Sequence, residues 1–166
     1  MLDDKLLGIY LNDHLAGSTV GVELVKRAAK ENKGTDYGEP LARIATEIEE
    51  DRDALQRLMS AIEVKREQHK VLAGWVAEKL GRLKPNGQIL GYSPLSRLVE
   101  LETLALGITG KKSLWEALIE VAGEDPRLDA GELNRLSERA DRQRDEVWQL
   151  RQRAAREAFA AQAPVP

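Results

Sequence analysis

The chain has 166 residues, a length that fits one domain able to bury a hydrophobic core without disulfide bridges. It contains no cysteine, which excludes thiol nucleophiles, disulfides, iron–sulfur clusters and thiolate zinc sites. Its 25 basic and 28 acidic residues are mixed along the chain, and the net charge of −3 argues against a nucleic-acid partner.

The N-terminal segment is acidic where a signal peptide would carry a basic region, and no apolar run approaches the roughly 20 residues of a membrane span. We therefore expect a cytoplasmic protein that has no membrane partner.

A first amphipathic helix is predicted from about Asp3 to Lys30, because acidic residues suit a helix start and the segment 31–34 supplies a stop. Gly17 and Gly21 lie on or near its buried side, where glycine costs about 1 kcal/mol relative to alanine. We expect them to allow close approach of a neighbouring helix or a tryptophan, and a ligand cavity is the alternative. The predicted buried face consists of Leu7, Leu11, His14, Ser18, Val22, Val25 and Ala29.

A second helix should follow a short loop, with Pro40 in its first turn. A short loop makes the two helices antiparallel neighbours, which places Ser18 beside Arg52 and His14 within about a turn of Asp51. Asp51 and Arg52 interrupt an otherwise apolar stripe formed by Leu41, Ile44, Ile48, Leu55, Leu58 and Ile62.

Residues 68–83 form another amphipathic segment. Heptad spacing would allow the region 40–84 to be one continuous helix. Such a helix would overshoot the first by many turns, so we prefer a break near 65–69 and a short extra helix crossing the bundle.

A third helix is predicted after Ser93, a good N-cap, with Pro94 at its first position. Glu102 lies beside its apolar seam of Leu98, Leu101, Ala105, Ile108, Trp115, Ile119 and Ala122. The last helix should begin after Asp129, and Arg144 interrupts its stripe of Leu133, Leu136, Ala140, Val147, Ala154 and Ala158. We expect one domain over residues 1–160 and a disordered tail over 161–166.

Two helical hairpins joined by a connection of about 28 residues are typical of a four-helix bundle with one long crossover. Counting from the helix starts brings the polar interruptions of the four stripes to similar heights. This predicts a polar layer in the core, made of His14, Ser18, Asp51, Arg52, Glu102 and Arg144.

The segments LNDHLAGSTVGVEL and GWVAEKLGRLKPNGQILGYSPLSRLVELETLALG, together with the two-hairpin layout, resemble an uncharacterised bacterial family with a ferritin-like four-helix bundle. The ferritin-like superfamily implies a carboxylate-bridged di-iron or di-manganese site with Glu-x-x-His motifs. Neither of the two histidines, His14 and His69, follows a glutamate by three residues.

The function that we expect is therefore non-catalytic: a bundle with a structural polar layer that acts through assembly or partner binding, with a homodimer as one possibility. Arg52 and Arg144 favour this interpretation, because a guanidinium repels a metal cation from the same pocket. Two alternatives stay open. One is an atypical iron or manganese site made by His14, Asp51 and Glu102, and the other is a small-molecule pocket.

Overall fold

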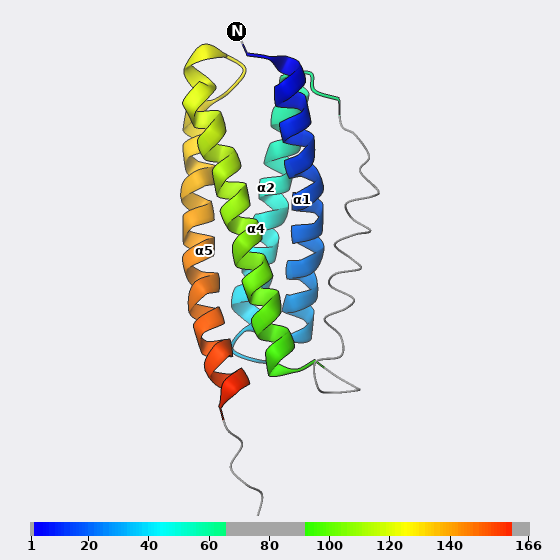
Figure 1. Cartoon of the computed structure of the whole chain (residues 1–166), viewed down its shortest axis with the longest axis vertical. Coiled ribbons are helices and arrows are strands. Elements are labelled where there is room, and N and C mark those ends of the chain that lie inside the picture. The colour runs from blue at the N-terminus through cyan, green and yellow to red at the C-terminus, as the bar shows by residue number, and fades with distance from the viewer. Residues whose placement is uncertain (1, 66–91, 161–166) are drawn as a thin grey trace, which may run out of the picture.

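The computed structural model describes residues 2–65 and 92–160, and Figure 1 shows them as a bundle of helices. The helices are α1 (Asp4–Glu31), α2 (Gly38–Ala61), α4 (Pro94–Val121) and α5 (Ala130–Phe159), with a 3-10 turn, η1 (Ala122–Glu124), after α4. Over these ranges no β-strand occurs, so the all-helical prediction is confirmed. The extra helix predicted within 68–83 and the tail 161–166 lie outside the described residues.

Three of the helix starts use side-chain caps that satisfy free backbone N–H groups. The Asp3 carboxylate accepts from the backbone nitrogens of Lys5 and Leu6 at 3.0 and 3.1 Å. Ser93 and Asp129 cap α4 and α5 in the same way. Each such cap is worth about 1 kcal/mol, which is why these three starts were predictable from the sequence.

Helix α2 ends earlier than predicted. Ile62 is its C-cap, Glu63 takes a left-handed conformation with φ of 59°, and the backbone nitrogen of Val64 donates to the carbonyl of Met59 at 2.9 Å. This is the hydrogen bonding of a Schellman motif, which ends a helix. The turn lies a few residues before the predicted break at 65–69, and it excludes one uninterrupted helix over residues 40–84.

The helices pack in two close pairs, α1 with α2 and α4 with α5, and α4 also lies against α1. The α1–α2 loop, the start of α4 and the end of α5 lie together at one end of the bundle (Figure 1). Apolar side chains from all four helices form one core, whose largest fully buried members include Trp115, Leu11, Leu41, Leu101 and Leu133. Of the described helices, none is long and apolar enough to cross a membrane.

Two polar core positions differ from those expected. On α5 the buried polar side chain is Gln143, whereas Arg144 is half-exposed and pairs with Asp141 on the same helix at 2.9 Å. On α4 the buried carboxylate is Glu100 rather than Glu102. Because α4 contacts both α1 and α5, its buried surface is wider than one stripe and includes the position of Glu100.

Candidate functional site

A group of charged and polar side chains near the middle of the bundle surrounds Asp51, whose side chain is only 1% exposed. We call it the middle cluster, and it consists of Glu47, Asp51, Lys111, Arg139 and Gln143. The Asp51 carboxylate accepts from Lys111, from Arg139 through Nε at 2.8 Å and through Nη2, and from the Gln143 amide at 3.3 Å. A buried carboxylate is tolerated only when it is paired and hydrogen-bonded in this way.

Lys111 is the cation of this cluster that comes from α4. Its Nζ donates to a carboxylate oxygen of Asp51 and to the side-chain oxygen of Gln143. Burial lowers the pKa of Lys111, while the negative charge of Asp51 and the hydrogen bond to it act in the opposite direction. The middle cluster therefore joins α2, α4 and α5 through one amine and one carboxylate.

Beside this cluster lies a cavity of about 380 Å³ between α1, α2 and α4, and most of its wall is apolar. Four glycines contribute to the wall, Gly17 and Gly21 from α1 and Gly107 and Gly110 from α4. A Cβ atom added at any of the four would meet no described atom within 4 Å. Among the described helices, none makes the close approach that we expected at Gly17 and Gly21. The alternative drawn from the sequence, a cavity, is what these glycines border.

Two buried hydrogen-bond donors, on residues that line this cavity, have no acceptor among the described residues. They are the indole Nε1 of Trp115, a side chain that is 1% exposed, and the guanidinium Nε of Arg52. Leaving a buried donor unsatisfied costs about 1–3 kcal/mol, so such atoms are few in native proteins. Both atoms are covered by surrounding protein atoms, so neither opens into the cavity.

Four of the residues expected in the polar layer line this cavity, namely His14, Ser18, Asp51 and Arg52. The imidazole of His14 packs edge-on against Tyr10, with ring centroids 4.6 Å apart. Burial lowers the pKa of His14, with Asp13 acting in the opposite direction. The hydroxyl of Ser18 donates to the backbone oxygen of Leu15 at 2.7 Å.

The other two expected residues lie elsewhere. Glu102 accepts from Arg151 of α5 at 2.9 Å and is half-exposed, and Arg144 is half-exposed on α5. Within residues 2–65 and 92–160, no three His, Asp or Glu side chains form a group that could hold a metal ion. His14, Asp51 and Glu102 do not come together, and two cations already hold Asp51. These residues do not fit the di-iron centre that the ferritin-like resemblance implies.

A second polar group, the end cluster, lies where the α1–α2 loop meets the start of α4. Its buried carboxylate is Glu100, 2% exposed, which accepts from Arg27 Nε of α1 and from the Tyr92 hydroxyl, both at 2.8 Å. Burial and the charge of Glu100 raise the pKa of Tyr92, so this hydroxyl stays protonated. The end cluster consists of Arg27, Asn32, Asp36, Tyr92, Arg97, Glu100, Arg153 and Glu157.

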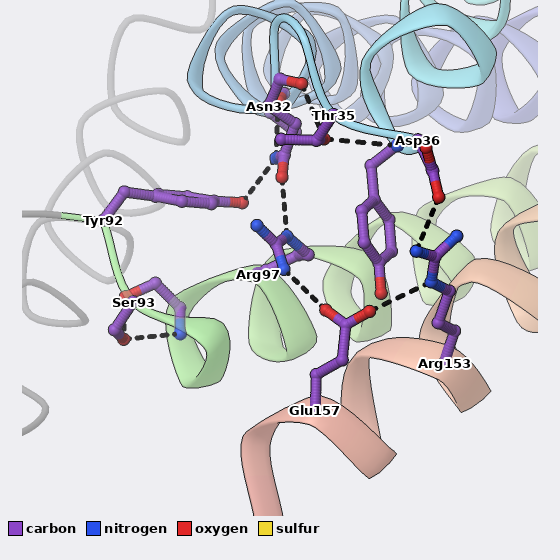
Figure 2. Close-up of polar contacts among 11 residues, drawn as sticks. Asn32, Thr35, Asp36, Tyr92, Ser93, Arg97, Arg153 and Glu157 are labelled. Carbon is purple, nitrogen blue, oxygen red and sulfur yellow. Dashed lines mark hydrogen bonds and ion pairs between the residues drawn. The ribbon is translucent and has the colours of Figure 1, made fainter.

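Figure 2 shows how this cluster reaches across the end of the bundle. Asn32, which is fully buried, donates to the Tyr92 hydroxyl at 2.9 Å and accepts from Arg97 Nε at 2.6 Å. Arg97 continues to Glu157 of α5 at 2.9 Å, and Arg153 joins Glu157 to Asp36 at 2.9 and 2.7 Å. The end cluster thus ties the α1–α2 loop to α4 and α5.

Reasoning from the sequence missed Lys111, Arg139 and Gln143. Arg139 and Lys111 looked like ordinary surface charges, and Gln143 is one residue from the arginine that was chosen. One signal was present: apolar residues 133, 136, 140, 147 and 154 of the last helix are separated by three, four, seven and seven residues. A step of three from 140 and a step of four to 147 both meet at Gln143.

No family model, no curated protein and no solved structure matches the chain.

Proposed function

We propose that this protein binds a small, largely apolar molecule in the cavity between α1, α2 and α4. The observation that carries the proposal is the apolar cavity of about 380 Å³ itself, which four glycines of two helices border. Cavities of a few hundred Å³ with an apolar wall and a few converging polar groups are typical of small-molecule sites.

The glycines support this proposal. Glycine inside a helix costs about 1 kcal/mol relative to alanine, and four glycines border one cavity from two facing helices. None of them gives a close backbone contact with a described atom in return. What the glycines provide instead is volume, which a ligand could occupy.

We also infer that the four helices belong to a ferritin-like bundle of two antiparallel hairpins. Short connections inside each pair, residues 32–37 and 122–129, support this layout. In such a bundle, cofactors and ligands bind between facing helices of the core. The homodimer expected from the sequence stays a prediction, to be checked by light scattering coupled to size-exclusion chromatography.

The test uses Gly21→Leu, which fills the cavity from α1. The probe is decan-1-ol, titrated into the full chain and followed by isothermal calorimetry. We expect the wild type to bind it and Gly21→Leu to lose at least tenfold in affinity, while thermal unfolding shows stability unchanged or up to about 0.8 kcal/mol higher, because leucine is the better helix former.

The matched control is Gly123→Leu. Gly123 also has no described atom within 4 Å of an added Cβ, but it lies in η1, away from the cavity. This control should bind decan-1-ol as the wild type does. If Gly21→Leu instead unfolds more easily, another part of the protein or a second copy fills the space and the proposal is wrong. Failure of the wild type to bind would overturn it as well.

A further inference from the structure

We propose that the ligand of this cavity is an uncharged, unbranched alkyl chain that lies lengthwise between α1 and α4. This inference rests on the proposed function and adds the shape and the chemical class of the ligand. It follows from how the cavity wall is distributed along the helices and from which charges of the wall are already paired.

The cavity extends along the helices. On α1 its lining residues run from Asp13 to Leu24, and on α4 they run from Thr103 to Trp115. At a rise of 1.5 Å per residue, these spans are about 16 and about 18 Å along the helix axes. Across the axes the cavity is confined by neighbouring helices, which pack with their axes roughly 8–10 Å apart. The cavity is therefore longer than it is wide.

The four glycines open this space at more than one level. Because α1 and α4 run in opposite directions (Figure 1), Gly21, nearer the end of α1, lies towards the start of α4, whereas Gly110 lies towards the end of α4. Gly17 and Gly107 precede them by about one turn on the same two helices. An added Cβ would meet no described atom within 4 Å at any of the four. The open space thus follows the helix direction, as an extended chain requires.

Apolar surface continues along the same two helices beyond the cavity. A second hollow of about 310 Å³ is lined by Leu6 and Tyr10 of α1 and by Ala117 and Val121 of α4, among others. The ring of Tyr10 contacts that of His14, which lines the cavity, with centroids 4.6 Å apart. The two hollows therefore lie end to end, so a chain that is longer than the cavity meets further apolar side chains.

Three charged residues that line the cavity are already paired with protein groups. Asp51 pairs with Lys111, and Arg52 contacts Glu49 at 3.3 Å and Asp53 at 3.6 Å. A charged ligand group among them would lose its hydration and would have to compete with these pairs. An alkyl chain leaves the pairs intact and gains from apolar burial alone.

The first experiment measures the affinity of the full chain for hexan-1-ol, octan-1-ol and decan-1-ol by isothermal calorimetry. Each buried CH₂ group should raise the affinity about fourfold, so each step of two groups should raise it about fifteenfold. The branched alcohol 2-propylheptan-1-ol has the same atomic composition as decan-1-ol. We expect it to bind at least tenfold more weakly, because its side branch makes the molecule shorter and wider.

Two cavity-filling variants test the lengthwise position. Gly21→Leu and Gly110→Leu fill the cavity from different helices and at different levels. Each should weaken decan-1-ol at least tenfold and leave hexan-1-ol within about threefold, because a short chain still fits in the part that stays open. Gly123→Leu is the control, since Gly123 does not line the cavity, and it should bind both alcohols as the wild type does.

The outcomes separate the two proposals. If the affinity stops rising between hexan-1-ol and decan-1-ol, or if the branched isomer binds as tightly as decan-1-ol, the site stands and the lengthwise alkyl chain is wrong. Equal losses for the short and the long alcohol in both leucine variants would contradict it too. If none of the alcohols binds, the site itself is refuted. The comparison of the alcohols uses the wild type, so it decides the question even if a leucine variant does not fold.

Discussion

The middle cluster and the end cluster share one feature, a carboxylate that is almost fully buried and held by cations. In the middle cluster, Asp51 is paired with Lys111 and Arg139. In the end cluster, Glu100 is paired with Arg27 and receives a hydrogen bond from Tyr92. The two carboxylates differ in what lies next to them.

Around Glu100 the polar atoms continue from one partner to the next, from Tyr92 through Asn32 and Arg97 to Glu157 (Figure 2). Beside Asp51 lies an apolar cavity of about 380 Å³. Ion pairs around a buried carboxylate therefore connect helices at one end of the bundle. In the middle of the bundle, similar ion pairs lie beside open space. The open space beside the buried charge, rather than the buried charge itself, distinguishes a candidate site from a structural network.

The largest loss of stability should come from Asp51→Asn. This change leaves Lys111 and Arg139 buried or half-buried without their counter-charge, and breaking a buried pair costs about 3–5 kcal/mol. Chemical denaturation should show a loss near the lower end of that range, since the amide still accepts one hydrogen bond. Asp53→Asn on the same helix, exposed and 3.6 Å from Arg52, should change stability by less than about 0.5 kcal/mol.

Glu100→Gln tests the same effect in the end cluster. It should lower stability by about 1–2 kcal/mol, which is less than the loss in Asp51→Asn. Arg27 is 38% exposed, so its guanidinium can turn to water when the carboxylate is lost, whereas Lys111 is 13% exposed and cannot. Equal losses in the two variants would contradict the idea that the middle cluster is the more deeply buried of the two.

Glycine-to-alanine substitutions should change the free energy of unfolding in opposite directions in the two regions. At Gly38, near the end cluster, an added Cβ would lie 2.6 Å from the backbone oxygen of Asn32, so Gly38→Ala should destabilise by about 1–3 kcal/mol. At Gly17, beside the cavity, an added Cβ meets nothing within 4 Å, and Gly17→Ala should stabilise by about 0.5–1 kcal/mol. Paired thermal melts measure both. A loss of stability in Gly17→Ala would show that the space is filled.

The smallest effect should be a pH dependence from His14. Burial lowers its folded-state pKa below the value of about 6.5 in the unfolded chain, so the unfolded state binds the proton first as the pH falls. Its contribution to stability is present above about pH 6.5 and is lost as the pH falls towards the folded pKa. Denaturation midpoints between pH 7.5 and 5 should fall less in His14→Gln than in the wild type. Parallel curves for the two proteins would contradict a half-buried His14 with a lowered pKa.

Local chemistry made much of the fold predictable. Asp3, Ser93 and Asp129 cap the helices that the sequence assigned to them, since a cap depends on residues within one turn. The end of α2 was misplaced because its left-handed residue is Glu63, whereas glycine is the usual signal for a helix stop. The polar interruption at Asp51 was predictable because a charged residue inside an apolar stripe faces the core, whichever helix packs against that stripe.

The sequence by itself determined the all-helical class, the helix starts and the presence of polar residues in the core, because periodicity and capping act within a few residues of each other. Only the tertiary structure decided which partners those residues meet: Lys111 and Arg139 for Asp51, Arg27 for Glu100, and open space for Gly17 and Gly21. A rotation of α5 by one residue exchanges Gln143 for Arg144, and a rotation of α4 by two residues exchanges Glu100 for Glu102. Such rotations are set by packing between helices that are far apart in sequence.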